Sequence, residues 1–421
     1  MTSLLPNELL VHIIKDVASS QTDLLRLRSA DRKFRHLVTP HAFRVLNVGY
    51  TPKSAKGLEC LLDSQVVAQY VEEISFEDTD DDTRKLVHEP NSDDEAICSS
   101  YSNALSALHR FPNLHSLFFD FFATNLEDEW NTGSASAYQQ FQRTVLEALS
   151  RSPQPHPSLK TLTIEGILPH IHAVYADPAF TAFIGSLHHL WWLVLVDGDE
   201  ESIGQRPFQN YWDTISTHVL RPAVSLRSLS LAAGDIKGGM PYINFNSVYC
   251  PHLESLSLTN VQFAVDTEAF IVQHKGTLTE LELDRCAIDY DYMGVDGIPG
   301  RSWADVWDRF ARELGELREL DVCFEESELD DSEGDELDGS AGDKLGDSAE
   351  DELDYSEGNE LDDSEEDDPQ KRYIGLNVHY GYVRQKRDLY GEDRDRDGPA
   401  LKALEELVRA RAGCEPGGPH D

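Results

Sequence analysis

The sequence lacks the features of a membrane, secreted or zinc-ribbon protein. Its longest apolar stretch is about seven residues, around residues 191–196, whereas a membrane-spanning helix needs about 20. The first eight residues contain no basic segment and no apolar run, so no secretory signal is visible. The six cysteines form no Cys-x-x-Cys pair, which fits a reducing compartment. We therefore expect an intracellular protein, in the cytoplasm, the nucleus or both.

Positive charge is scarce, with 36 Lys and Arg against 77 Asp and Glu, for a net charge of −41. A chain this acidic binds nucleic acids and anionic membranes poorly, so we expect neither as a partner. More than half of the negative charge lies in residues 325–368, which hold 23 acidic residues and one Lys. They form a tandem octapeptide whose copies open with Leu at positions 329, 337, 345, 353 and 361. We predict a disordered acidic insertion, because a period of eight fits neither a helix nor a strand. A tether for a basic partner, or a kinase substrate, stays an alternative.

Motifs for catalysis are also missing. The chain has no hydrolase nucleophile elbow, no zinc-protease helix motif and no glycine-rich nucleotide loop. Residues 393–398 open like a calcium-binding loop, but the twelfth position, which needs a bidentate Glu, is Leu404. We interpret Asp397 and Gly398 as a turn, followed by a helix that begins at Pro399. We predict no catalytic residue, no metal site and no cofactor.

The first 50 residues reverse the charge trend, with seven basic and four acidic residues. Apolar residues between Leu9 and Val17 fall on one helical stripe, and a second stripe runs from Leu24 to Val38. We expect Pro40 to open a third short helix that carries Leu46. So small a bundle cannot hide all of its large aliphatic side chains, so part of this surface should be buried against another protein.

These residues resemble the F-box. The resemblance is carried by Leu4-Leu5-Pro6-Asn7-Glu8-Leu9-Leu10, by Asp23-Leu24-Leu25-Arg26-Leu27-Arg28, and by Arg32-Lys33-Phe34-Arg35-His36-Leu37. The family often has Trp in its third helix, where Phe43 stands here. The resemblance implies binding to a Skp-family adaptor and, through it, to a cullin complex. An ordinary helical cap on a larger domain is the alternative. The expected adaptor contacts are Leu5, Pro6, Leu9, Leu24, Leu27 and Phe34.

The middle of the chain repeats the pattern Leu-x-x-Leu-x-Leu at intervals of 25 to 45 residues, after a weaker copy at Val71-Ile74-Phe76. The shorter intervals match leucine-rich repeats, in which each copy is one short strand with a returning helix or loop. An α/β sheet of another kind is the alternative. The seven copies are Leu114-Leu117-Phe119, Leu159-Leu162-Ile164, Leu190-Leu193-Leu195, Leu226-Leu229-Leu231, Leu253-Leu256-Leu258, Leu278-Leu281-Leu283 and Leu317-Leu320-Val322.

The predicted fold class is therefore α/β: a three-helix F-box in residues 1–50, an irregular leucine-rich-repeat solenoid in 51–324, the disordered acidic insertion in 325–368, and a terminal strand and capping helix in 369–421. Returning helices are expected at residues 141–149, 212–220, 270–274 and 303–314. We expect an acidic surface loop at residues 77–100, a strand at 373–378, and a last helix at 399–411 that packs on the solenoid end.

Together, the two parts resemble the leucine-rich-repeat F-box proteins of fungi. This resemblance implies a non-catalytic subunit that recognises substrates for a cullin-based ubiquitin ligase. A binding scaffold that works outside any ligase is the alternative, and an enzyme in an unrecognised α/β fold is disfavoured by the missing motifs.

The expected substrate surface is the face of the strands that points away from the core. Its early strands offer Phe118, Trp192 and Val194, its middle strands offer mostly Ser, and its late strands offer carboxylates. We expect a protein substrate, possibly basic, with an apolar residue toward Trp192 and Lys or Arg toward the late strands. The alternative is that the carboxylates only keep an edge soluble. These carboxylates are Glu280, Glu282, Asp284, Glu319 and Asp321.

Overall fold

The computed structural model describes residues 21–76, 92–121, 137–151, 158–195, 205–234, 240–289, 302–324, 373–377, 381–384 and 391–413, together with His156 and five single residues before residue 21. The predicted disordered acidic insertion, residues 325–368, lies outside these ranges.

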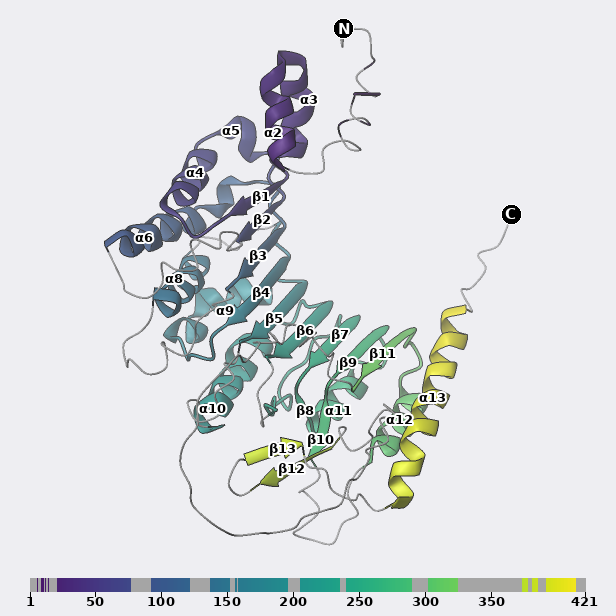
Figure 1. Cartoon of the computed structure of the whole chain (residues 1–421). Coiled ribbons are helices and arrows are strands. Elements are labelled where there is room, and N and C mark those ends of the chain that lie inside the picture. Colours follow the sequence, from purple (N-terminus) through teal and green to yellow (C-terminus); the bar gives the residue numbers. More distant parts are fainter. Residues whose placement is uncertain are drawn as a thin grey trace, which may run out of the picture.

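A nine-stranded parallel sheet organises the molecule, as Figure 1 shows, and confirms the α/β class. Each strand pairs with the strand before it in the chain, except where the two-residue or three-residue strands of a second sheet intervene. Parallel neighbours need a crossover connection, and most of these crossovers contain a helix. The strands are β1 Val45–Val48, β2 Glu73–Phe76, β3 Ser116–Asp120, β4 Thr161–Ile167, β5 His189–Val194, β6 Ser228–Ala233, β7 Ser255–Thr259, β9 Glu280–Asp284 and β11 Glu319–Cys323.

The crossover helices lie along one face of the sheet (Figure 1), and the four predicted at residues 141–149, 212–220, 270–274 and 303–314 are present. Residues 216–220 continue α10 as a π-helical turn. The expected loop at 77–100 is wrong in its last part, where α6 begins at Ser92 and buries Cys98. The helices of this layer are α4 Pro52–Leu62, α5 Gln65–Ala68, α6 Ser92–Ser106, α8 Ala137–Ser150, α9 Pro178–Gly185, α10 Gln205–Ile215, α11 Val265–Gln273 and α12 Trp303–Glu313.

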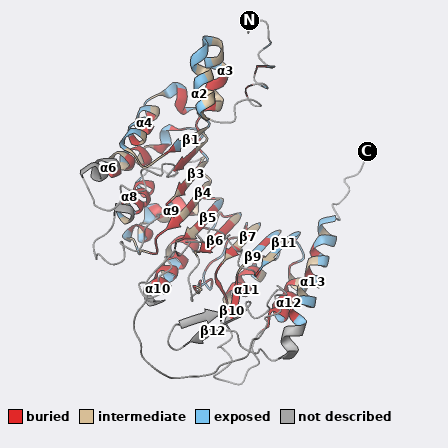
Figure 2. Cartoon of the chain, in the orientation of Figure 1, coloured by how far each residue is buried: buried red, intermediate tan, exposed pale blue. Residues whose placement is uncertain are grey.

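The core lies between the sheet and these helices. Apolar residues alternate along each strand and stand in register with those of the neighbouring strands, so two continuous apolar rows cross the sheet. Figure 2 shows this buried layer along the strands from β1 to β9, whereas Leu320 and Val322 of β11 are only partly buried. The first row is Ile74, Leu117, Leu162, Leu190, Leu229, Leu256, Leu281 and Leu320, and the second is Phe76, Phe119, Ile164, Trp192, Leu231, Leu258, Leu283 and Val322.

One predicted copy of the repeat has the wrong register. Leu190 pairs with Leu162 and Leu229, which occupy the second position of their copies, and Trp192 pairs with Ile164. The true copy is therefore Leu187-Leu190-Trp192, three residues before the predicted Leu190-Leu193-Leu195. In the strand, Trp192 faces the core and Trp191 faces away from it, since successive side chains point to opposite faces.

A second, four-stranded sheet follows the ends of β7 and β9. It contains β8 Gln262–Phe263, β10 Ala287–Asp289, β12 Tyr373–Asn377 and β13 Gly381–Arg384. Asn260 and Arg285 turn the chain out of the main sheet with positive φ angles of 57° and 50°. The strand predicted at residues 373–378 is confirmed as β12, whereas β13, its antiparallel neighbour, was not predicted.

Two helices stand beyond the β1 end of the sheet: α2 Gln21–Ala30 and α3 Arg32–Ala42. The predicted third helix, which was to open at Pro40 and carry Leu46, is wrong. Pro40 lies in the last turn of α3, and Leu46 is a buried residue of β1. Pairing with β2 determines this outcome, because Leu46 and Val48 extend the two apolar rows of the sheet.

The last helix, α13 Gly391–Gly413, packs beside α12 and β11 at the other end of the sheet, as predicted, and buries Leu404 and Val408. It begins earlier than residue 399, so the turn predicted at Asp397 and Gly398 is wrong. The buried Asp397 carboxylate accepts a hydrogen bond of 2.7 Å from the backbone N–H of Ala304, at the start of α12. This bond satisfies one of the free N–H groups of that helix end, which favours continuing α13 through Asp397.

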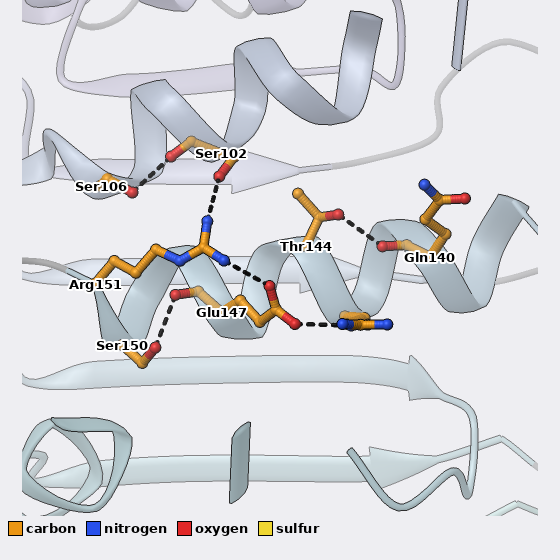
Figure 3. A network of polar contacts seen from close by, with 8 residues as sticks. Ser102, Ser106, Gln140, Thr144, Glu147, Ser150 and Arg151 are labelled. Atoms are coloured by element: carbon orange, nitrogen blue, oxygen red, sulfur yellow. Dashed lines mark hydrogen bonds and ion pairs between the residues drawn. The ribbon is translucent and has the colours of Figure 1, made fainter. Parts of the chain in front are cut away.

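Neighbouring helices of the covering layer are also joined at the surface, as Figure 3 shows for α6 and α8. Arg151 donates to the Ser102 hydroxyl at 3.4 Å and forms an ion pair with Glu147 at 2.7 Å, and Arg143 reaches the other oxygen of Glu147 at 2.7 Å. These side chains are largely exposed, so the network contributes little stability beside the apolar core.

Candidate protein-binding surfaces

The helical pair α2–α3 and the residues before it carry apolar side chains that stay exposed in the described part of the chain. Of the ten residues of α2, three are Leu, yet none is buried. The exposed fraction is 41% for Leu25 and 50% for Leu9, which lies in the helical turn that precedes α2. Leu9 and Leu25 are therefore two exposed apolar side chains in the N-terminal part of the chain.

The predicted adaptor contacts divide into two groups. Leu24, Leu27 and Phe34 are half-buried and pack against a small core of Ile14, Val38 and Ala42, so they hold the helical pair together. Pro6 and Leu9 are exposed, and Leu5 lies outside the described residues. Leu25 was not predicted as a contact, although the sequence had placed it in the same Leu-rich helix.

The helical pair is held to the sheet by polar contacts. The Gln21 side-chain amide donates to the backbone oxygens of Ala42 at 3.1 Å and Val45 at 2.9 Å. Arg28 donates to the Thr39 hydroxyl at 3.0 Å and lies over the ring of Phe43 at 5.1 Å. Phe43 therefore packs at the base of the pair, in the helix cap of α3, and not in a third helix.

The second surface is the face of the main sheet opposite the helices α4 to α10, which we call the open face. Its central row, read in register, contains Asn47, Ser75, Phe118, Thr163, Trp191, Ser230, Ser257, Glu282 and Asp321. The predicted position of Phe118 on this face is borne out, and its side chain is half-buried.

The prediction that Trp192 and Val194 face a partner is wrong. The exposed fraction of both side chains is 0%, and the indole N–H of Trp192 donates to the Tyr211 hydroxyl of α10 at 2.9 Å. The register of β5 instead presents Trp191, with an exposed fraction of 44%. An exposed Trp on a strand is a typical interface anchor, because it buries a large area at a small entropic cost.

The late strands form an acidic end of the open face. Glu280 stands opposite Glu319, and Glu282 stands opposite Asp321, in adjacent parallel strands. All four are exposed, and no ion pair neutralises them among the described residues. Like charges placed directly opposite one another destabilise a sheet, so this arrangement has an energetic cost that a basic partner would relieve. Asp284 differs, since it forms an ion pair with Arg285 at 3.3 Å.

Two titratable side chains outside these surfaces, His172 and Cys250, have pKa values that burial shifts. Burial lowers the pKa of His172 to about 4, with further contributions from His170 and Arg143. Burial also raises the pKa of the Cys250 thiol to about 12. At neutral pH the His172 imidazole is therefore uncharged and the Cys250 thiol stays protonated.

Within the described part of the chain, no group of three or more His, Cys, Asp or Glu side chains could hold a metal ion. Over the same ranges, no helix has the length and apolar character needed to cross a bilayer.

Comparison with known proteins adds no relative. No model of a known protein family matches the chain, and no curated protein matches it significantly.

Proposed function

We propose that this chain is the substrate-recognition subunit of a cullin-based ubiquitin ligase. The segment from Leu5 to Phe43 binds a Skp-family adaptor as an F-box, and the sheet with its helices acts as an irregular leucine-rich-repeat solenoid that binds a target protein. Catalysis belongs to the assembled complex, in which the receptor holds the target near the transferring enzyme.

The observation that carries this proposal is the exposure of the Leu9 and Leu25 side chains. Leu24 and Leu27 pack within the helical pair, whereas Leu9 and Leu25 keep exposed fractions of 50% and 41%. An interface that covers these two side chains accounts for their exposure. Because each is already about half covered, its burial contributes about 1 kcal/mol. The local excess of basic over acidic residues in residues 1–50 suits an acidic adaptor. The pair lies beyond β1, so an adaptor bound there leaves the open face accessible (Figure 1).

The first prediction tests the adaptor interface. A Leu9→Asp/Leu25→Asp double variant should lose at least tenfold in affinity for the adaptor, because it places two carboxylates in the centre of the apolar contact. The measurement is co-purification from cells with the proteasome blocked, followed by mass spectrometry, with the thermal melt of the variant as the check on folding.

The matched control for that experiment is Ile171→Asp/Val265→Asp. These two apolar side chains are at least as exposed, at 56% and 63%, and belong to the segment between β4 and α9 and to α11. The control should bind adaptor normally. Undiminished adaptor binding by the Leu9 and Leu25 variant would remove the F-box proposal. Adaptor capture without any cullin would favour the ligase-independent scaffold instead.

The second prediction tests the acidic end as the binding site for basic residues of the target. Reversing charge at Glu280, Glu282 and Asp321 to Lys should weaken target capture about tenfold at low salt. The effect should shrink toward twofold at about 0.5 M salt, because the charges are exposed and screened. Adaptor binding should not change.

Its control reverses three exposed carboxylates that lie off the open face, as Asp63→Lys/Asp213→Lys/Glu406→Lys, for the same change in net charge. Equal loss in both triple variants would mean that the overall charge, and not the acidic end, governs capture.

A further inference from the structure

A cluster of basic side chains lies along the edge of the main sheet at which β4 to β7 begin, in a chain whose net charge is −41. Lys160, His188 and Arg227 occupy the position directly before β4, β5 and β6, and their backbones are joined strand to strand. The N–H of His188 donates to Lys160 O at 2.8 Å, and the N–H of Arg227 donates to His188 O at 2.7 Å. His189 opens β5 on the open face, and His252 precedes β7. We call these five residues the basic edge.

The five groups are close enough to influence one another. The pKa of His188 is lowered by partial burial and then by the charges of Lys160, Arg227, His189 and His252. Adjacent parallel strands are about 4.8 Å apart, so Lys160, His188 and Arg227 lie within about 10 Å along the edge. A positive charge on His188 is therefore disfavoured unless an anion balances it.

Few neighbouring groups offset this positive charge. Arg227 forms an ion pair with Glu254 at 2.8 Å, and the Lys160 ammonium donates to the backbone oxygen of Ser186 at 3.3 Å. One strand further along the same edge, His115 stands 3.7 Å from Glu72. Among the described residues, Glu254 is therefore the one carboxylate that forms an ion pair with a member of the basic edge.

We propose that the basic edge binds the oxyanion of an acidic side chain, a carboxylate or a phosphate, in a partner segment that lies across the open face. This inference rests on the proposed function and refines its target. The segment carries an anionic residue at the basic edge, an apolar residue on Trp191, which lies two residues after His189 on the same face, and basic residues at the acidic end. From β5 to β9 the sheet spans three strand steps, about 14 Å. An extended chain covers that distance in about four residues.

Binding at the basic edge should also respond to pH. An anion at the basic edge stabilises the protonated imidazole of His188, whose pKa is lowered by burial and by the neighbouring charges, so the bound state takes up a proton and binding strengthens as the pH falls. Lys160 and Arg227 stay charged over the same range and provide the pH-independent part.

The experiment uses the full chain and fluorescein-labelled decapeptides with one central Trp, followed four residues later by Lys-Lys. The residue before the Trp is Glu, phosphoserine, Ser or Lys. Anisotropy should show that the Glu and phosphoserine peptides bind at least fivefold more tightly than the Ser and Lys peptides. Comparison of Glu with phosphoserine identifies which oxyanion the site prefers, and either preference supports the proposal.

The decisive variants are Lys160→Glu/Arg227→Glu and a control with the same change in charge, Lys53→Glu/Lys56→Glu, on the exposed surface of α4. We expect Lys160→Glu/Arg227→Glu to lower the affinity for the Glu peptide about tenfold and the control to lower it less than twofold. Wild-type affinity for the Glu peptide should rise severalfold from pH 7.5 to 6.0, and a His188→Ala variant should not show this rise. Equal affinity for all four peptides, or equal loss in both double variants, would overturn the inference. Adaptor co-purification, measured on the same variants, reports separately on the proposed function.

Discussion

Replacing Trp192 by Ala should destabilise the fold by about 3–5 kcal/mol, the cost of removing a large aromatic side chain from a core. The side chain is fully buried between β5 and α10, and its loss leaves the Tyr211 hydroxyl without the indole donor that it has at 2.9 Å. Replacing the adjacent Trp191 should change stability by less than about 1 kcal/mol, since its exposed fraction is 44%. Thermal and urea unfolding, followed by circular dichroism, measure both.

The two substitutions should affect target binding in the opposite order to their effects on stability. Trp191→Ala should reduce target capture at least tenfold, because an exposed Trp in the centre of the open face is the expected anchor. If Trp192→Ala does not fold, Trp192→Phe provides the milder comparison, since it keeps a ring but loses the hydrogen bond to Tyr211, at a cost of about 1 kcal/mol. A Trp191 variant that unfolds easily and still binds its target would show that the register of β5 has been assigned wrongly.

Trp191 and Trp192 show which part of the strand register the sequence predicts and which part it does not. Period-two alternation of apolar residues predicted the strands correctly wherever the neighbouring positions are polar, as in Ser255-Leu256-Ser257-Leu258. The segment around β5 contains Leu at 187, 190, 193 and 195, so two frames of the repeat fit it equally well. The packing of α10 against Trp192 selects between them.

A local signal could still have resolved the frame. In the other copies, the two residues between the first and second Leu are polar, for example His115-Ser116 and Lys160-Thr161. His188-His189 continues this rule, whereas Trp191-Trp192 breaks it. That correction also moves His188 and His189 into line with Lys160 and Arg227, which is how the basic edge becomes visible.

Other differences depend on contacts between distant parts of the chain. Asp397 accepts a hydrogen bond from the backbone N–H of Ala304, which lies 93 residues earlier in the first turn of α12, and no local pattern predicts such a bond. Leu46 was expected in a third helix that opens at Pro40, whereas residues 45–48 instead form β1 and pair with β2 at the end of the sheet. The exposure of Leu25 likewise depends on where α3 packs against α2. The apolar stripe of α2 alone does not predict that position.

A buried ion pair between α11 and α12 leads to the last prediction. The Glu268 side chain is fully buried, and its Oε1 accepts from Arg309 Nη1 at 2.8 Å, while 38% of the Arg309 side chain is exposed. Arg309→Met should destabilise the fold by roughly 2–4 kcal/mol, because it removes the cation that balances a carboxylate held out of water. The partial exposure of Arg309 keeps the expected value below that of a fully buried pair.

A second substitution separates lost charge balance from lost packing. In the double variant Glu268→Gln/Arg309→Met no buried charge remains, so at least half of the lost stability should return. A surface pair that joins the same part of the fold, Lys275 to Glu313 at 2.8 Å, provides the matched control. Lys275→Met should cost less than about 1 kcal/mol, since both partners are solvated. Urea unfolding of the four proteins tests this order, and an Arg309→Met variant as stable as Lys275→Met would show that water already screens the Glu268 carboxylate.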